Sequence, residues 1–130
     1  MNYRSVSDMN ETVLANLHRL PPDIDLVVGV PRSGLLAANL LSLMANIPLT
    51  DLDSLLDRRL YTPGTTKATA RTVRPLEEMR RILILDDSIS GGTAMARARE
   101  RVAQSGIEAE FIFAAVYGTQ ADHPEADLVF

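Results

Sequence analysis

The sequence predicts an α/β fold in three layers, with a mostly parallel central sheet and helices on both faces. Two apolar segments without polar alternation, residues 24–30 and 82–85, are typical of strands covered on both faces. Each is followed by a glycine-containing turn and then by a helix-forming segment, and strands joined in this way form right-handed parallel units. A chain of 130 residues can bury one core, so we expect a single domain over residues 1–130.

The composition excludes several kinds of protein. With no cysteine, the chain has no disulfide, no thiol nucleophile and no cysteine-based metal site. It contains no apolar run of the roughly 18 residues that suggest a membrane span, and its N-terminus has no charged-then-apolar signal pattern. We therefore expect a cytoplasmic protein without a membrane partner. A net charge of −4 argues against nonspecific binding to nucleic acid.

The first predicted element is an amphipathic helix over residues 5–20. Either Ser5 or Ser7 can cap it, and Pro21 and Pro22 end it. Its apolar stripe at helical spacing consists of Met9, Val13, Leu17 and Leu20.

A strand at residues 24–30 then leads through a turn into a helix over residues 35–45, which is apolar nearly all round. A helix of this kind is typically covered on every side, so we expect it deep in the core. The turn has a glycine at either end, a hydroxyl (Ser33) and a guanidinium (Arg32). These groups suit a phosphate, but by themselves they also fit an ordinary solvated turn.

The pattern loosens after a short predicted strand at residues 47–50 and stays loose over residues 51–81. Within this stretch, residues 61–73 are rich in threonine and contain Lys67 and Arg71. The segment is either a solvated surface hairpin or a basic lid over a ligand, and its composition leaves both interpretations open.

The strongest functional signal begins where the strand at residues 82–85 runs into Asp86 and Asp87. In open α/β sheets, ligands bind at the carboxyl ends of the strands. Carboxylates at that place can accept hydrogen bonds from sugar hydroxyls or hold a hydrated Mg²⁺.

The turn after these acids contains Gly91 and Gly92, which let the backbone approach a ligand closely. It leads into a predicted helix over residues 95–104, and the start of a helix favours an anion such as phosphate. A phosphate cradle beside two acids is complementary to a sugar phosphate. The alternative is an ordinary strand–turn–helix unit capped by Ser90 or Thr93.

The C-terminal part continues the alternation. Gly106 is a plausible end for the helix, residues 110–117 are predicted as a strand, residues 118–125 as a loop, and residues 126–130 as the beginning of a last strand. Tyr117 could line an acceptor pocket at the end of its strand, although a core position fits it better.

Residues 83–95 resemble the phosphoribosyl-pyrophosphate signature of the type I phosphoribosyltransferases, in which an apolar strand, two acids and two mostly apolar residues precede a five-residue phosphate loop. The resemblance implies that Asp86 and Asp87 bind the ribose 2′ and 3′ hydroxyls, directly or through Mg²⁺. Ser90 stands where several purine-specific members carry an acid that can act as a base, a role that serine cannot take. The implied 5′-phosphate loop consists of Ser90, Gly91, Gly92, Thr93 and Ala94.

A second motif is similar to the pyrophosphate loop of the same family, which reads Gly-apolar-X-basic-small-Gly. Here it consists of Gly29, Val30, Pro31, Arg32, Ser33 and Gly34. In the family a non-proline cis peptide often precedes the basic residue, which would place one between Pro31 and Arg32. The two motifs occur in the family's order, and the resemblance extends over residues 24–118.

The resemblance implies that the chain transfers the ribose 5-phosphate group of phosphoribosyl pyrophosphate to a nitrogen acceptor, most often a nucleobase, and releases pyrophosphate. Mg²⁺ would be the cofactor, held by Asp86 and Asp87 through water. A flexible basic loop closes over the pyrophosphate in the family, which would give Lys67 and Arg71 a catalytic role together with Arg32 and the two acids. We also expect a homodimer. The pyrophosphate itself would be bound by Pro31, Arg32, Ser33 and Gly34.

The acceptor side is less complete in this sequence. Family members usually build a hood over the acceptor from terminal segments, but this chain ends at Phe130 as a strand begins. The hood is therefore reduced, or is supplied by residues 1–20 or a partner chain, or the native protein continues further.

The sequence also bears on three other kinds of function. One alternative is a non-catalytic sensor that binds phosphoribosyl pyrophosphate or a nucleotide. A receiver-like signalling domain is disfavoured because it would need a lysine in a fixed place, and Lys67 lies in the loose region. A Walker-type nucleotide triphosphatase is excluded because the Gly-Lys-Ser/Thr sequence is missing.

Overall fold

The computed structural model describes residues 5–61, 75–88, 93–118 and 126–130. Helices and strands alternate along most of these residues. The helices are α1 (Val6–Asn16), α2 (Ser33–Ala45), α3 (Leu52–Leu56) and α4 (Thr93–Ala103), with short 3₁₀ helices η1 (Leu17–Arg19) and η2 (Leu76–Glu78). The strands are β1 (Leu26–Gly29), β2 (Leu49–Asp51), β3 (Arg81–Ser88), β4 (Glu110–Tyr117) and β5 (Leu128–Val129).

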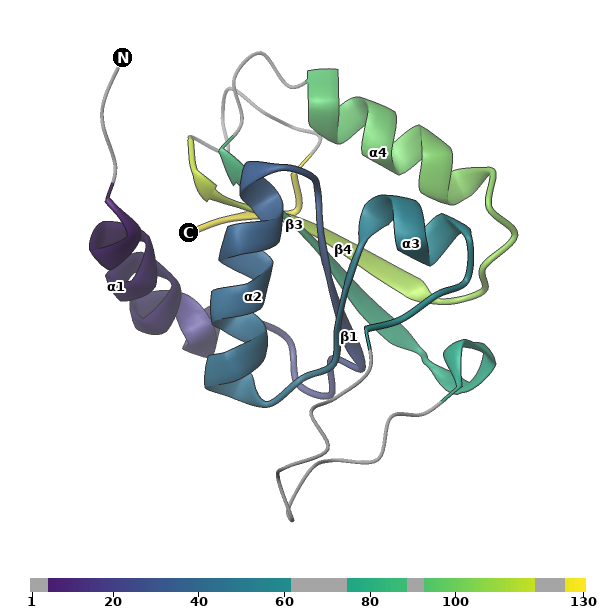
Figure 1. The fold of residues 1–130 in the computed structure, drawn as a ribbon, viewed down its shortest axis with the longest axis horizontal. Coiled ribbons are helices and arrows are strands. Elements are labelled where there is room, and N and C mark those ends of the chain that lie inside the picture. Colours follow the sequence, from purple (N-terminus) through teal and green to yellow (C-terminus); the bar gives the residue numbers. More distant parts are fainter. Residues whose placement is uncertain (1–4, 62–74, 89–92, 119–125) are drawn as a thin grey trace.

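The strands form one parallel sheet in the order β2-β1-β3-β4-β5. Helices α1 and α2 lie on one side of it, and α3 and α4 lie on the other (Figure 1). The predicted three-layer α/β fold is therefore confirmed.

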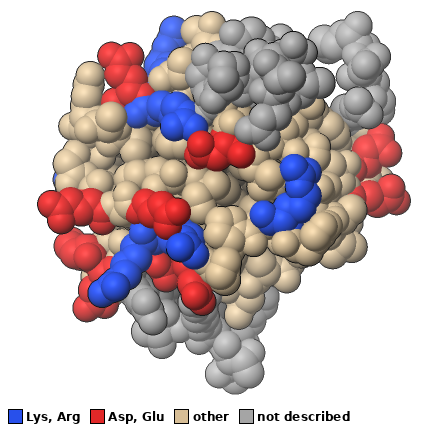
Figure 2. Space-filling model, turned by 180° about the vertical axis from the view of Figure 1, so that it is seen from behind, with Lys and Arg blue, Asp and Glu red and all other residues tan. Residues whose placement is uncertain are grey.

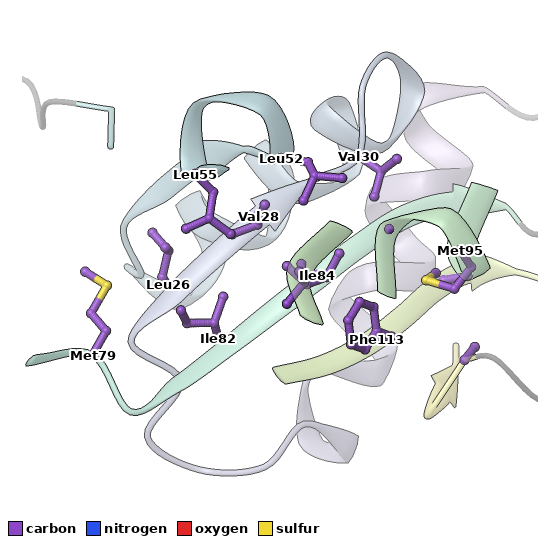
Figure 3. Close-up of a cluster of buried hydrophobic side chains, with 14 of the residues drawn as sticks. Leu26, Val28, Val30, Leu52, Leu55, Met79, Ile82, Ile84, Met95 and Phe113 are labelled. Atoms are coloured by element: carbon purple, nitrogen blue, oxygen red, sulfur yellow. The ribbon is translucent and has the colours of Figure 1, made fainter. Parts of the chain in front are cut away.

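Both faces of the central strands are buried. Val28, Ile82 and Ile84 point into the layer beneath α3 and α4 (Figure 3), whereas Val27 and Leu83 point into the layer beneath α1 and α2. Because successive side chains of a strand alternate between two dry faces, the sequence of these strands shows a continuous apolar run instead of alternation.

The start of α1 distinguishes between the two caps that the sequence allowed. The Ser5 hydroxyl accepts a hydrogen bond from the Asp8 N–H at 3.0 Å, and the Asp8 carboxylate accepts one from the Ser5 N–H at 3.2 Å. This reciprocal pair is a capping box. The α-helix ends at Asn16, earlier than the predicted limit, and η1 continues it by one tighter turn.

Two elements differ from the prediction. Strand β3 continues through Asp86 and Asp87 to Ser88 instead of ending before the acids, because Asp86 and Ser88 still pair with β4. Helix α3 lies in the stretch over which the sequence pattern loosens and for which no helix was predicted. A helix of five residues is too short to produce a periodic apolar signal.

The expectation that the apolar helix after β1 is deeply buried is wrong for its outer side. The side of α2 toward the sheet is buried, but Leu36 is 41% exposed and Leu43 is 65% exposed. The sheet covers one side of α2 and α1 packs beside it, and no other element among the described residues covers the opposite side of the helix.

Charged side chains are mixed on the surface. Figure 2 shows acidic and basic side chains intermingled on the face turned away from the view of Figure 1. Exposed pairs such as Arg99 with Asp127 and Arg81 with Glu110 are both 2.8 Å apart, and pairs of this kind contribute about 0–1 kcal/mol each. None of the helices in the described ranges is long and apolar enough to cross a membrane.

Candidate active site

The carboxyl ends of β1 and β3 meet at one edge of the sheet. The two strands are parallel neighbours with Gly29 beside Leu85, and the Val30 N–H donates a hydrogen bond to the Leu85 carbonyl oxygen at 3.0 Å. The turn after β1 therefore lies directly against the acids that follow Leu85. This is the edge at which open α/β sheets bind ligands.

Two glycines make this close approach possible. A Cβ atom on Gly34 would lie 2.9 Å from the Leu85 carbonyl oxygen and 3.0 Å from both Cα and Oδ1 of Asp86. A Cβ atom on Gly29 would lie 2.6 Å from Cα of Leu35. Glycine is therefore required at both ends of the turn, so that the first turn of α2 can pack on the ends of β1 and β3.

The turn itself presents its polar groups outward. Pro31, Arg32 and Ser33 are exposed, and the peptide bond between Pro31 and Arg32 is cis, as the resemblance implied. Arg32 occupies the N-cap position of α2, and no acidic residue stands in the first turn of this helix. A guanidinium, a hydroxyl and the partial positive charge of a helix start thus lie together, which suits an anion.

The two acids have different surroundings. Asp86 is only 9% exposed, and its Oδ1 accepts a hydrogen bond from the Asp87 N–H at 2.8 Å. The resemblance implies that both acids bind a ligand, but Asp86 is largely shielded from solvent, because Gly34 lies against it from the side of α2. Asp87 is half-buried and is the more accessible carboxylate of the pair.

Burial also changes the acidity of Asp86. Loss of solvent raises the pKa of Asp86 to about 7, and its hydrogen bond and charge interaction with the Asp87 carboxylate add to this increase, while the hydrogen bond from the Asp87 N–H opposes it. An ionised Asp86 is therefore costly unless a ligand brings positive charge or hydrogen-bond donors.

The other predicted site residues fall partly outside the described ranges. Of the 5′-phosphate loop, the structure describes Thr93 and Ala94, which form the exposed first turn of α4. Three more residues of that loop and both predicted lid residues lie outside the described residues: Ser90, Gly91, Gly92, Lys67 and Arg71.

One polar pair near the turn after β1 was not predicted from the sequence. The Tyr61 hydroxyl donates a hydrogen bond to Asp51 Oδ2 at 2.6 Å, and Ser54 donates two more to the same carboxylate. Burial alone would raise the pKa of Asp51, but these hydrogen bonds outweigh it and lower the pKa. The same bond raises the pKa of Tyr61 to about 12. The available sequence signal was Asp51 itself, an acid at the end of a short strand and three residues before Ser54, which is the spacing of a helix N-cap.

Tyr117 lies at the end of β4, opposite Ser88. It is half-buried and packs against the core beneath α1 and α2. The interpretation of Tyr117 as a core residue is thus the better of the two that the sequence allowed.

The acid pair suits only a metal ion that needs few ligands from the protein. In the described part of the chain, no group of three or more His, Cys, Asp or Glu side chains could hold a metal. Mg²⁺, however, usually keeps several waters and is bound by one or two carboxylates together with substrate phosphates. Asp86 and Asp87 fit an ion that arrives with a phosphorylated substrate.

The comparison with known families agrees with this geometry. The family model of the phosphoribosyl transferase domain matches residues 4–128. The chain belongs to this family. Because the match includes both turns and both acids, the turn after β1 and the acid pair are parts of one family domain.

Solved structures with the same fold include phosphoribosyltransferases of this family. The purine phosphoribosyltransferase of Pyrococcus horikoshii is 22% identical with a TM-score of 0.62, and the match covers 98% of this chain and 84% of that one. The xanthine-guanine-hypoxanthine phosphoribosyltransferase of Helicobacter pylori is 14% identical with a TM-score of 0.62, over 98% and 80% of the two chains. Both likenesses concern the fold.

A larger protein contains the same fold as one part. UMP synthase of Leishmania donovani is 20% identical with a TM-score of 0.56, and the match covers 85% of this chain but 22% of that protein. The chain therefore spans about a fifth of that protein's length. Among curated protein sequences, none matches.

Proposed function

We propose that the chain transfers the ribose 5-phosphate group of phosphoribosyl pyrophosphate to a nitrogen acceptor, a nucleobase, and releases pyrophosphate. The observation that carries the proposal is the contact at Gly34, where the exposed turn with Arg32 touches the carboxylate of Asp86. An anion-binding turn and an acid pair in contact match a molecule that carries pyrophosphate next to ribose hydroxyls.

Each part of the substrate would be bound by a different group of residues. Asp87, as the accessible acid, would accept hydrogen bonds from the ribose hydroxyls. Asp86 would hold Asp87 in place by accepting the hydrogen bond from its N–H. Arg32 and the start of α2 would bind the pyrophosphate, and the first turn of α4 at Thr93 would bind the 5′-phosphate. Binding the phosphate at a distance from the reacting carbon orients the ribose for attack.

In the reaction, the acceptor nitrogen forms a bond to the anomeric carbon as the bond from that carbon to the pyrophosphate oxygen breaks. The electron pair leaves with pyrophosphate, and the acceptor nitrogen loses its proton. Arg32 would stabilise the charge that develops on the leaving group. Mg²⁺, held through water by Asp87 and Asp86, would supply further positive charge there.

The serine at position 90 limits the range of nucleobases that we expect as acceptors. Several purine-specific members carry an acid at this position that can act as a general base, and serine cannot take this role. We therefore expect little activity with hypoxanthine or guanine.

Lys67 and Arg71 would close over the pyrophosphate and exclude water.

The proposal is tested by measuring pyrophosphate release from phosphoribosyl pyrophosphate with a panel of nucleobases. We expect Mg²⁺-dependent release with at least one base and a loss of at least tenfold in Asp87→Asn. Glu108→Gln, which removes the same charge from an exposed site before β4, is the matched control and should retain the activity of the parent.

A complementary variant is the double replacement of Lys67 and Arg71 by alanine. It should lower turnover far more than the melting temperature, because charge at a closing loop acts on the reacting state. Binding of phosphoribosyl pyrophosphate without turnover with any base would overturn the transferase proposal in favour of the sensor. Absence of binding, measured calorimetrically with Mg²⁺, would overturn both.

A further inference from the structure

A cavity lies at the end of the sheet opposite the acid pair. Its volume is about 270 Å³, and three segments that are distant in the sequence meet around it: the turn after α3, the 3₁₀ helix η2 before β3, and the turn between α4 and β4. Figure 1 shows the last two where β3 and β4 begin, whereas the candidate active site lies where β1 and β3 end. The cavity is lined by Arg58, Leu76, Glu77, Gly106, Ile107 and Glu108.

The inner wall of the cavity is apolar. Leu76 is 9% exposed and belongs to the buried cluster beneath α3 and α4, and the half-buried Ile107 packs against the same cluster. Pockets for drug-sized ligands have volumes of about 300–1,000 Å³, so this cavity suits a smaller molecule. The apolar wall favours a molecule with an aliphatic chain over a fully hydrated ion.

The charged side chains around the cavity do not neutralise one another. Arg58 brings one positive charge, Glu77 and Glu108 bring two negative charges, and all three residues are exposed. Among the described residues, none of the three takes part in an ion pair. Opposite charges that share a cavity without pairing are available to a ligand that carries charges of both signs.

Arg58 is fixed at both its backbone and its side chain. Its φ of 59° lies in the left-handed region, which is uncommon for a residue with a side chain. Its N–H donates a hydrogen bond to the Leu55 carbonyl oxygen at 2.8 Å, and its Nη2 donates one to the Ser105 carbonyl oxygen at 3.0 Å. The second bond uses one of the five N–H donors of the guanidinium. A cation held in this way is pre-organised for an anionic group, because little side-chain freedom is lost on binding.

We propose that this cavity binds a free basic α-amino acid of the lysine or arginine type. Its α-carboxylate would pair with Arg58, and its α-ammonium and terminal cation would pair with Glu77 and Glu108. Its aliphatic stem would cover Leu76 and Ile107, as the stems of long cationic side chains cover apolar surface. A ligand with one negative and two positive groups thus complements a lining with one positive and two negative groups. Binding does not require the transferase reaction, because the cavity and the acid pair lie at opposite ends of β3.

Calorimetric titration with L-lysine and with L-arginine tests the proposal in the absence of phosphoribosyl pyrophosphate. Low salt is needed, since salt screens exposed charges, and ligand concentrations up to about 10 mM reach weak complexes. We expect one saturable site per chain. L-Norleucine, which lacks the terminal ammonium, and cadaverine, which lacks the α-carboxylate, should each bind roughly tenfold or more weakly than L-lysine, because each loses one charge-assisted contact.

Two variants and their neighbours locate the site. Arg58→Gln and Glu77→Gln should each weaken the binding of L-lysine roughly tenfold or more. The matched controls are Arg59→Gln and Glu78→Gln, which remove the same charges from exposed residues next in the chain that do not line the cavity. They should change the affinity by no more than about twofold.

Three results would overturn the proposal. The first is the absence of saturable binding of both amino acids, and the second is binding of L-norleucine or cadaverine as tight as that of L-lysine. The third is equal weakening by the test and control variants, which would indicate attraction to the general surface charge. Pyrophosphate release is measured separately, so its absence would count against the transferase proposal and leave this one standing.

Discussion

Replacement of Gly34 by alanine tests the contact on which the site depends. The new Cβ would lie 2.9 Å from the Leu85 carbonyl oxygen and 3.0 Å from Cα and Oδ1 of Asp86, whereas ordinary contact begins near 3.4 Å. The helix or the strand must then move by about 0.5 Å, because backbone atoms cannot rotate away as side chains do. Overpacking of this kind destabilises by about 1–3 kcal/mol.

Helix propensity acts in the opposite direction, so the sign of the change in stability is informative. Alanine favours a helix over glycine by up to about 1 kcal/mol, and Gly34 is the second residue of α2. If the steric contact dominates, the net loss is about 1–2 kcal/mol, which lowers the melting temperature by roughly 3–8 °C in a domain of this size. Thermal unfolding followed by circular dichroism measures this change.

Two further variants calibrate the measurement. Ser33→Ala changes an exposed neighbour in the same turn and should stay within about 0.5 kcal/mol of the parent. Gly29→Ala should be worse than Gly34→Ala, because its Cβ would come within 2.6 Å of Leu35 Cα and no helix propensity is gained. A melting temperature of Gly34→Ala equal to or above that of the parent would refute the close contact.

Three more predictions concern pH and hydrogen bonding. Because the pKa of Asp86 is raised from 3.8 to about 7, the folded state holds this proton more tightly than the unfolded chain, and stability should fall as the pH rises from about 4 to about 7. Asp86→Asn should remove that fall and, by urea unfolding near pH 8, exceed the parent by on the order of 3 kcal/mol; lower stability there would contradict the argument. The pKa of Tyr61, raised to about 12 by Asp51, means that their pairing is complete below pH 10 and is lost as the pH rises through about 12. Asp51→Asn should shift the tyrosinate absorbance of Tyr61, identified with Tyr61→Phe, back toward pH 10, and an unchanged curve would refute the bond. Asp127 accepts a hydrogen bond from the Phe113 N–H at 2.9 Å, so Asp127→Ala should lose about 1–3 kcal/mol in urea unfolding, whereas a loss as large in Asp127→Asn, which keeps an acceptor, would point to another cause.

The residues of the candidate site could be placed at strand ends and turns where local sequence carries the signal. The glycines at positions 29 and 34 and the acids at 86 and 87 could be assigned from their place after apolar strands, since strand ends and turns are local features. The different burial of the two acids could not be assigned in this way. Asp86 is buried because the start of α2 lies over it through Gly34, a contact between segments far apart in the chain.

The pairing of Asp51 with Tyr61 was missed for a similar reason. Ten residues separate the two, and α3 brings them together by turning the chain back along β2, where the Tyr61 N–H bonds to the Leu49 carbonyl oxygen at 3.1 Å. A five-residue helix leaves little trace in the sequence, because periodicity needs at least two turns to be recognised.

By itself, the sequence determined that this chain is an α/β protein with a parallel sheet, and it predicted a glycine-containing turn after one strand and an acid pair at the end of another. It did so because dry strands, glycine turns and acids at strand ends follow from the chemistry of consecutive residues. Only the tertiary structure decided which of the two acids is buried and how much of α2 is covered. The apolar character of Leu36 and Leu43 called for burial, but whether a neighbour covers them depends on the packing of distant segments, and no segment of the described ranges does.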